Sequence, residues 1–152
     1  MILSVSRRTD IPAFYSDWFF NRIKAGFVDV RNPMNIHRIS RIDISPEVVD
    51  CIDFWTKNPK VMIPRLEELS DYKYYFQFTV NPYDRHIEEE VPLKRNIFDT
   101  FHELSDMIGV NRVVWRYDPI LMTKKIDMDY HIKYFEEIAK RLSGYSNKCV
   151  IS

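Results

Sequence analysis

The sequence predicts an α/β fold: a partial (β/α) barrel with five largely parallel strands and an inserted hairpin, in one α/β domain over residues 1–152. Apolar strand-like runs alternate with amphipathic helical segments along the chain. One segment interrupts the alternation with two strand-like runs around an Asn-Pro turn signal. The final run, CVIS, has no helix after it to cover an apolar parallel strand, which favours the N-terminal part of a larger barrel.

A complete five-stranded doubly wound sheet is the alternative. Chain length favours it, because 152 residues are enough for one domain with its own core. Both folds require right-handed crossovers between parallel strands, so the order of elements alone leaves the choice open.

The first half of the chain is predicted to contain a strand, a helix, a hairpin and a second strand. The first strand is expected at residues 2–6. Ser16 can cap a short helix that Gly26 ends, because glycine readily adopts the left-handed conformation that follows a helix. The hairpin is predicted at residues 27–45 and the next strand at residues 48–57.

The second half is predicted to alternate helices and strands. A helix is expected at 58–70 with Pro59 in its first turn, although Pro64 can disturb it. Apolar residues at steps of three and four predict helices at 93–109 and 128–144. Their expected inward-facing residues are Leu93, Ile97, Phe101, Leu104 and Ile108 in the first helix, and Ile132, Phe135, Ile138, Ala139 and Leu142 in the second. The remaining strands are predicted at 73–82, 110–119 and 148–152.

Composition narrows the classes of partner and the compartment. The formal net charge is zero, so the overall field gives no reason to expect nucleic acid or an anionic membrane. Cys51 and Cys149 lie far apart and match no zinc spacing, which predicts two buried free thiols in a reducing compartment. No apolar run approaches the roughly 20 residues of a membrane-spanning helix, and the N-terminus lacks a signal-peptide pattern. A cytoplasmic protein without a membrane partner is predicted.

A candidate site is predicted where the strands end. In parallel α/β folds, ligands bind at the carboxyl ends of the strands. Reading those ends in order gives SRRTD, WTKNP, TVNPY and WRYDP, each a polar cluster directly after an apolar run. The opposite ends carry ordinary turn and capping residues. The carboxyl edge of the sheet is therefore the expected location of function.

Alternation of side chains along a strand predicts which polar residues share a face. The candidate substrate- or anion-binding residues are Arg7, Arg8, Lys57, Asn58, Gln77, Thr79 and Arg116. The candidate catalytic residues are Asp10, Asp53 and Asp118. Arginine offers a fixed fork of donors for carboxylate or phosphate, and lysine a point charge. The carboxylates could neutralise these cations, orient them, or act as an acid or base if burial raised a pKa.

Structural roles are the alternative for several of these residues. Asp10 precedes Pro12 and Asp118 precedes Pro119, and both pairs suit turns or caps. Lys57 could be a surface residue and Asn58 a helix cap, without a role in binding. No metal site is predicted, because the histidines share no ligand spacing, and the acidic run is expected to be a solvated loop. The histidines are His37, His86, His102 and His131, and the last two are expected on helix surfaces or flanks. The acidic run is Glu88, Glu89 and Glu90.

Five segments together resemble an uncharacterised bacterial family of domain-of-unknown-function proteins: SVSRRTDIPAFYSDWFFNRI, FVDVRNP, FWTKNP, YYFQFTVNPY and RVVWRYDPI. The resemblance covers essentially the whole chain. Members of that family are longer and carry a C-terminal cysteine cluster similar to the iron-sulfur motif of radical S-adenosylmethionine enzymes; more distantly, they are similar to spore photoproduct lyases. The chain looks like the N-terminal half of such a protein.

The resemblance implies the first functional hypothesis. The chain would be the N-terminal fragment of a radical S-adenosylmethionine-like enzyme, with a polar anion-binding site at the strand ends. It would hold no cofactor itself, whereas the full-length protein would use a [4Fe–4S] cluster and S-adenosylmethionine. The expected partners are a small anionic ligand and the remaining C-terminal part of the barrel.

Two other hypotheses stay open. A non-catalytic phosphate- or nucleic-acid-binding module would use the same cationic strand ends, with Tyr83 and Tyr117 stacking on bases. Its affinity would fall steeply with salt. A small doubly wound domain, complete as it stands, would instead bind a protein partner.

Overall fold

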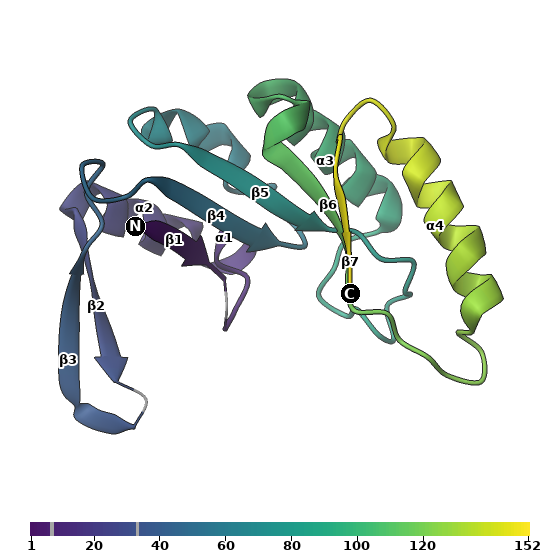
Figure 1. Ribbon diagram of the computed structural model, residues 1–152, viewed down its shortest axis with the longest axis horizontal. Helices are drawn as coiled ribbons and strands as arrows, with labels where there is room; N and C mark the ends of the chain where they lie inside the picture. The colour runs from purple at the N-terminus through teal and green to yellow at the C-terminus, as the bar shows by residue number, and fades with distance from the viewer. Residues whose placement is uncertain (7, 33) are drawn as a thin grey trace.

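The protein forms an open five-stranded sheet with helices and a separate two-stranded hairpin, as seen in a computed structural model (Figure 1). The structure describes residues 1–6, 8–32 and 34–152, with Ile36 described without its side chain. The elements are β1 (Ile2–Val5), α1 (Ile11–Phe14), α2 (Ser16–Ala25), β2 (Phe27–Asn32), β3 (Asn35–Asp43), β4 (Cys51–Thr56), η1 (Ile63–Leu69), β5 (Tyr74–Thr79), α3 (Lys94–Ile108), η2 (Val110–Arg112), β6 (Val113–Tyr117), α4 (Met128–Leu142) and β7 (Cys149–Ile151).

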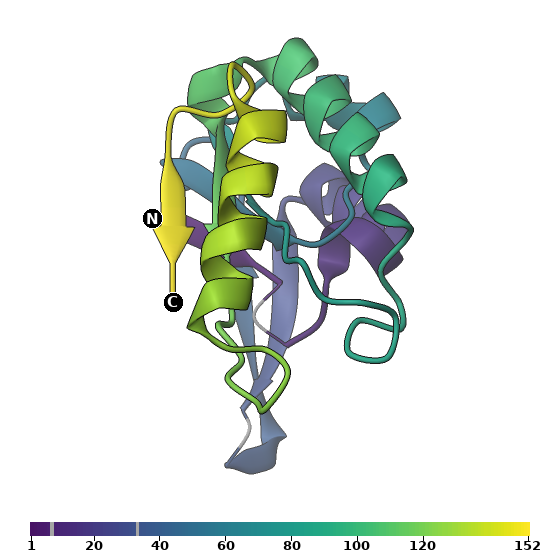
Figure 2. The ribbon, with the colours of Figure 1, turned by 90° about the vertical axis from the view of Figure 1, so that its right-hand side faces the viewer.

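The sheet runs in the order β1-β4-β5-β6-β7, and every neighbouring pair is parallel. This order follows the chain without the reversal that defines a doubly wound sheet. Right-handed crossovers that always advance in one direction place their helices on one face. Figures 1 and 2 show the helices on one side of the sheet. The predicted α/β fold with five parallel strands and an inserted antiparallel β2–β3 hairpin is confirmed.

The core lies between the sheet and its helices, and aromatic rings dominate it. The Phe54 and Phe76 rings stack at 4.7 Å between centroids, and the rings of Phe78 and Phe101 stack at 5.0 Å. All four are fully buried. Trp55, next along the strand from Phe54, points to the other face and is 37% exposed. The predicted alternation of apolar and polar faces is therefore confirmed.

One predicted helix has a different geometry. Residues 63–69 form the 3₁₀ helix η1, and the predicted α-helix at 58–70 is wrong in type and in its start. Pro64 lies in the first turn of η1. Its ring lacks the N–H of an α-helical hydrogen bond, so a short, tighter helix replaces a longer one.

The inward face of α4 also differs from the prediction. Ile132 is 61% exposed, whereas His131 is 5% exposed and occupies the inward position. His131 can be buried because both of its ring nitrogens have partners: Nδ1 lies 2.7 Å from the Tyr117 hydroxyl and Nε2 lies 2.9 Å from the Leu121 carbonyl oxygen. A carbonyl only accepts, so Nε2 carries a proton, and in the neutral imidazole Nδ1 is the acceptor for the Tyr117 hydroxyl. The expected surface position of His131 is wrong.

Both cysteines are free, as predicted. The predicted burial is wrong for Cys149, which is exposed because β7 is an edge strand, and Cys51 is only partly buried. In the part of the chain that the structure describes, no helix combines the length and apolar character required to span a membrane.

Candidate functional site

The sheet face opposite the helices carries a polar cluster formed by β4, β5 and the end of β6. We call it the Asp53–Arg116 cluster, and its members are Asp53, Trp55, Gln77, Arg116 and Asp118. The parallel register explains their proximity, since Trp55 lies beside Gln77 across the β4–β5 ladder. Strand alternation places Asp53 and Trp55 on the same face. Three separate strands thus contribute side chains to one surface.

Asp53 is a buried carboxylate held by neutral donors. It is 6% exposed, and one of its oxygens accepts a 2.6 Å hydrogen bond from Nε1 of Trp55. Nε2 of Gln77 donates to both carboxylate oxygens at 2.9–3.0 Å. Within residues 1–6, 8–32 and 34–152, no cation forms a salt bridge with it. Burial, followed by the charge of Asp53, raises the pKa of the neighbouring Tyr75.

Arg116 is the cation of the same surface, and it is held in place on two sides. Its guanidinium carbon lies 4.2 Å from the centre of the Trp55 ring. Its Nη2 donates to Asp118 at 2.5 Å, and its side chain is 11% exposed. Its Nε is buried and has no hydrogen-bond partner among the described residues. Arg116 is therefore an ordered cation whose hydrogen-bonding capacity is incompletely used.

Asp10 joins the end of β1 to the end of β4. Its carboxylate accepts hydrogen bonds from the Thr56 hydroxyl at 2.7 Å and from the Lys57 backbone N–H at 2.6 Å. It also caps α1 by accepting from the Ala13 N–H at 3.1 Å. Burial raises the pKa of Asp10 despite these hydrogen bonds, which act in the opposite direction. All of these contacts are internal, and they match the turn-and-cap alternative.

Glu88, in the loop after β5, joins the ends of β4 and β5. It is 7% exposed, and its two oxygens accept from Nζ of Lys57 at 2.8 Å and from Nζ of Lys94 at 2.6 Å. Asn81 donates to it at 3.2 Å. Burial raises the pKa of Glu88, but the hydrogen bonds from the two lysines outweigh burial and hold it below its ordinary value. The expectation of a solvated loop is wrong for this residue.

Asn81 and Asp118 continue the connections to the far edge of the sheet. The Asn81 side chain donates to the Asp118 carbonyl oxygen at 2.7 Å and accepts from its N–H at 3.0 Å. The Asp118 carboxylate accepts from the Ser152 hydroxyl at 2.6 Å. Side-chain hydrogen bonds therefore link the carboxyl ends of all five strands, from Asp10 to Ser152, in one series.

The predicted site residues separate into distinct places. Asp53, Gln77, Arg116 and Asp118 come together, and Thr79 is buried in register beside Arg116. Lys57 turns to Glu88, and Asn58 accepts from the backbone N–H of Lys60. Arg8 is exposed and lines a cavity beside β1. Arg7 lies outside the described residues.

Sequence reasoning assigned no role to Trp55 or Glu88. The place of Trp55 in the cluster could have been predicted, because Trp55 and Asp53 are two residues apart on one strand and therefore share a face. The burial of Glu88 could not have been predicted, since the sequence does not show which of the three consecutive glutamates turns inward. In the described part of the chain, no group of three or more His, Cys, Asp or Glu side chains is placed to hold a metal ion.

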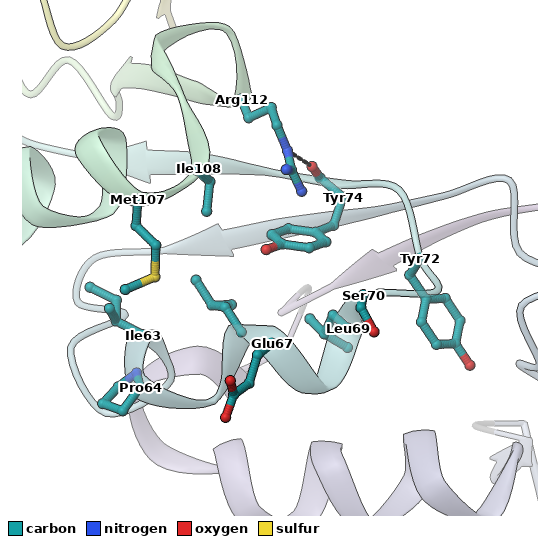
Figure 3. Close-up of a pocket in the computed structure, with 11 residues that line it drawn as sticks. Ile63, Pro64, Glu67, Leu69, Ser70, Tyr72, Tyr74, Met107, Ile108 and Arg112 are labelled. Carbon is teal, nitrogen blue, oxygen red and sulfur yellow. Dashed lines mark hydrogen bonds between the residues drawn. The ribbon is translucent and has the colours of Figure 1, made fainter.

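A second cavity lies at the opposite ends of the strands, between η1 and the end of α3 (Figure 3). Its volume is about 430 Å³. Arg112 lies at the rim of this cavity, and its Nε donates to the Tyr74 carbonyl oxygen at 2.9 Å. The guanidinium carbon of Arg112 lies 4.0 Å from the centre of the Tyr74 ring. In barrels the amino ends of strands serve stability, whereas ligands bind at the carboxyl ends. The Asp53–Arg116 cluster is therefore the stronger candidate site.

Replacing Glu88 with Gln is expected to lower the free energy of unfolding by about 1.5 kcal/mol, the lower range for charge-assisted hydrogen bonds. The value is low because Lys57 and Lys94 are partly hydrated. Because the pKa of Glu88 is lower in the folded than in the unfolded protein, its ionised form stabilises the fold at pH values above the ordinary pKa of 4.5. This stabilisation is lost as the pH falls through the pKa of the folded state. The difference between wild type and variant should therefore shrink on acidification. Urea unfolding at several pH values measures it, with the exposed Glu89→Gln as control. Equal stability of the two variants at neutral pH would contradict the buried position of Glu88.

Comparisons with known proteins add one assignment. No curated protein matches the chain, and no solved structure does. The model of a family described as Domain of unknown function (DUF1848) matches residues 2–152. Because the match extends over almost the entire sequence, including every strand of the parallel sheet, this chain belongs to the DUF1848 family.

Proposed function

We propose that the open sheet face is the ligand-binding wall of a (β/α)-barrel-type enzyme. Arg116 binds an anionic group, and Asp53 accepts a hydrogen bond from a hydroxyl or ammonium group of the same ligand. The observation that carries this proposal is the pairing of two under-compensated groups on one surface: a buried carboxylate without a cation among the described residues, and a buried arginine Nε without an acceptor there.

Trp55 gives this surface its third property. Its ring lies between the two charged groups, in contact with both, and is 37% exposed. A flat apolar surface flanked by a carboxylate and a guanidinium suits a small ligand that has an anionic group and a hydrogen-bond donor. With a bound substrate, Asp53 would be placed as a general base, because it already faces the ligand side of the sheet.

The iron-sulfur cluster implied by the resemblance does not fit the residues of this chain. Such clusters are held mainly by Cys thiolates, commonly four of them. The chain has two cysteines, and these lie on β4 and β7 with β5 and β6 between them. A radical S-adenosylmethionine-like activity would need thiolates from another part of a longer protein. On this proposal the chain supplies the substrate wall, and further strands would continue the sheet from β7.

The nucleic-acid alternative is less well supported. Tyr83 and Tyr117 are each 1% exposed, so the prediction that they stack on bases is wrong. Lys57 is also paired with the buried Glu88, so it does not extend the cationic surface around Arg116 towards a phosphate backbone. No observation on the described surface favours this alternative over a small ligand.

The indole N–H signals of the three tryptophans test the proposal by ¹⁵N NMR. Trp55 lies in the cluster, whereas Trp115 is buried and donates to the Val80 carbonyl oxygen, so it serves as an internal control. Titration with S-adenosylmethionine and with inorganic pyrophosphate should shift the Trp55 signal saturably and leave Trp115 unchanged. The Arg116→Lys variant, which loses the guanidinium fork, should bind at least about tenfold more weakly. The exposed Arg95→Lys is the matched control. Unchanged affinity in Arg116→Lys would refute the role of Arg116.

A further inference from the structure

A cavity of about 370 Å³ lies beside β1, enclosed by α2 and by β2 of the hairpin. Its walls are mainly apolar, with Leu3 and Val5 from β1, Trp18 and Phe19 from α2, and Val28 and Val30 from β2. Trp18 and Val30 are 45% and 43% exposed, so apolar surface is accessible at this place. Cavities of this size with mostly apolar walls and a few polar groups are typical of small-molecule sites.

The charged residues that line this cavity are both cationic. Arg8 and Arg22 contribute to the lining, and no acidic side chain does so. Neither arginine forms a salt bridge within the described ranges. The carboxylate of Asp29 on the hairpin accepts two hydrogen bonds from Arg41 at 2.8 and 2.9 Å, which lower the pKa of Asp29, and the charge of Arg22 lowers it further. The cavity therefore combines apolar walls with two arginines that form no salt bridge within the described ranges.

The backbone around Ser6 is specialised at the same place. Ser6 has φ of +88°, which is uncommon for a residue other than glycine. Its hydroxyl accepts from the Ile11 N–H at 3.0 Å, which fixes the turn from β1 into α1. Ser6 and Arg8 both line the cavity, so the residue with this uncommon backbone conformation forms part of its wall. Backbone conformations of this kind concentrate at ligand-binding sites.

We propose that this cavity binds a small carboxylate with an apolar acyl or aryl body. The carboxylate interacts with Arg8 and Arg22, and the apolar body lies against Trp18 and the hairpin valines. The two guanidinium groups suit a carboxylate by charge and by donor geometry. This site shares no residue with the Asp53–Arg116 cluster, so ligand binding at the two places can be measured separately.

Octanoate, octanol and acetate are the probes for this site, because they separate the charge from the apolar body. In ¹⁵N NMR of the full chain, octanoate should shift the Trp18 indole signal saturably with a Kd below about 1 mM. Octanol and acetate should each bind at least about tenfold more weakly, and Trp55 and Trp115 should not respond. Octanol binding as tightly as octanoate, or no saturable Trp18 shift, would overturn the proposal.

Arginine variants give the second arm of the test. Arg8→Gln and Arg22→Gln should each raise the Kd for octanoate about fivefold or more, whereas the exposed Arg95→Gln should leave it unchanged. Thermal unfolding of each variant establishes that it is folded. If one variant does not fold, the comparison of octanoate with octanol on the wild-type chain still decides. Wild-type affinity in both folded variants would contradict the assignment of the carboxylate to these arginines.

Discussion

Phe54→Ala is expected to lower the free energy of unfolding by about 4 kcal/mol, which is the typical cost of removing a buried phenylalanine ring. Phe54 is fully buried on the helix side of β4. Its ring stacks on Phe76 at 4.7 Å and meets Phe19 edge-to-face at 5.2 Å. These neighbours come from β5 and α2, so the cavity left by alanine cannot be filled by the movement of a single element.

Phe14→Ala is the matched control, because Phe14 is 57% exposed on α1. Its substitution should change the free energy of unfolding by less than about 1 kcal/mol. Urea-induced unfolding measured by circular dichroism gives both values. A loss below about 1.5 kcal/mol for Phe54→Ala would show that this ring is not at the centre of a packed core.

Asp10→Ala is expected to cost about 3 kcal/mol. The change removes the cap of α1, typically worth about 1 kcal/mol, and leaves the partly buried Lys57 N–H without its acceptor, at a further cost of about 1–3 kcal/mol. Asp10→Asn should also destabilise, because its amide NH₂ would face either the Lys57 N–H or the Ala13 N–H, and both of these groups can only donate. Thermal unfolding of the two variants measures the effect.

Asp17→Ala provides the comparison for a surface carboxylate. Asp17 accepts from Arg65 at 2.6 Å, but its side chain is 95% exposed, so its loss should cost less than about 1 kcal/mol. If Asp10→Ala were as mild as Asp17→Ala, the connection between the ends of β1 and β4 would contribute little to the fold.

The fold could be predicted well because local and long-range signals agree. Alternating strands and helices require parallel crossovers, and the apolar parity of β4 and β5 identifies the face that the helices cover. The errors arose where tertiary contacts override local pattern. Pro64 replaces the predicted α-helix with the shorter 3₁₀ helix η1. His131 replaces Ile132 in the core, because Tyr117 and the Leu121 carbonyl satisfy the hydrogen bonds of its ring nitrogens.

The candidate site could be predicted only in part. Strand parity predicts that Asp53, Gln77 and Arg116 lie together, because side chains on the same face of neighbouring parallel strands are held close to one another. Parity cannot show where a long side chain turns once its strand has ended, so the pairing of Lys57 with Glu88 had no signal. Arg8 likewise follows the turn at Ser6, whose positive φ is not evident from a serine in the sequence.

The contact between Trp55 and Arg116 tests the central claim most directly, because these residues lie on β4 and β6 with β5 between them. Nuclear Overhauser effects between the Trp55 ring protons and the Arg116 side chain are expected, together with an upfield shift of the Arg116 Hδ protons by the ring current. Absence of both effects in the folded protein would contradict the account, since the two residues would then face separate surfaces and the proposed ligand-binding wall would not exist.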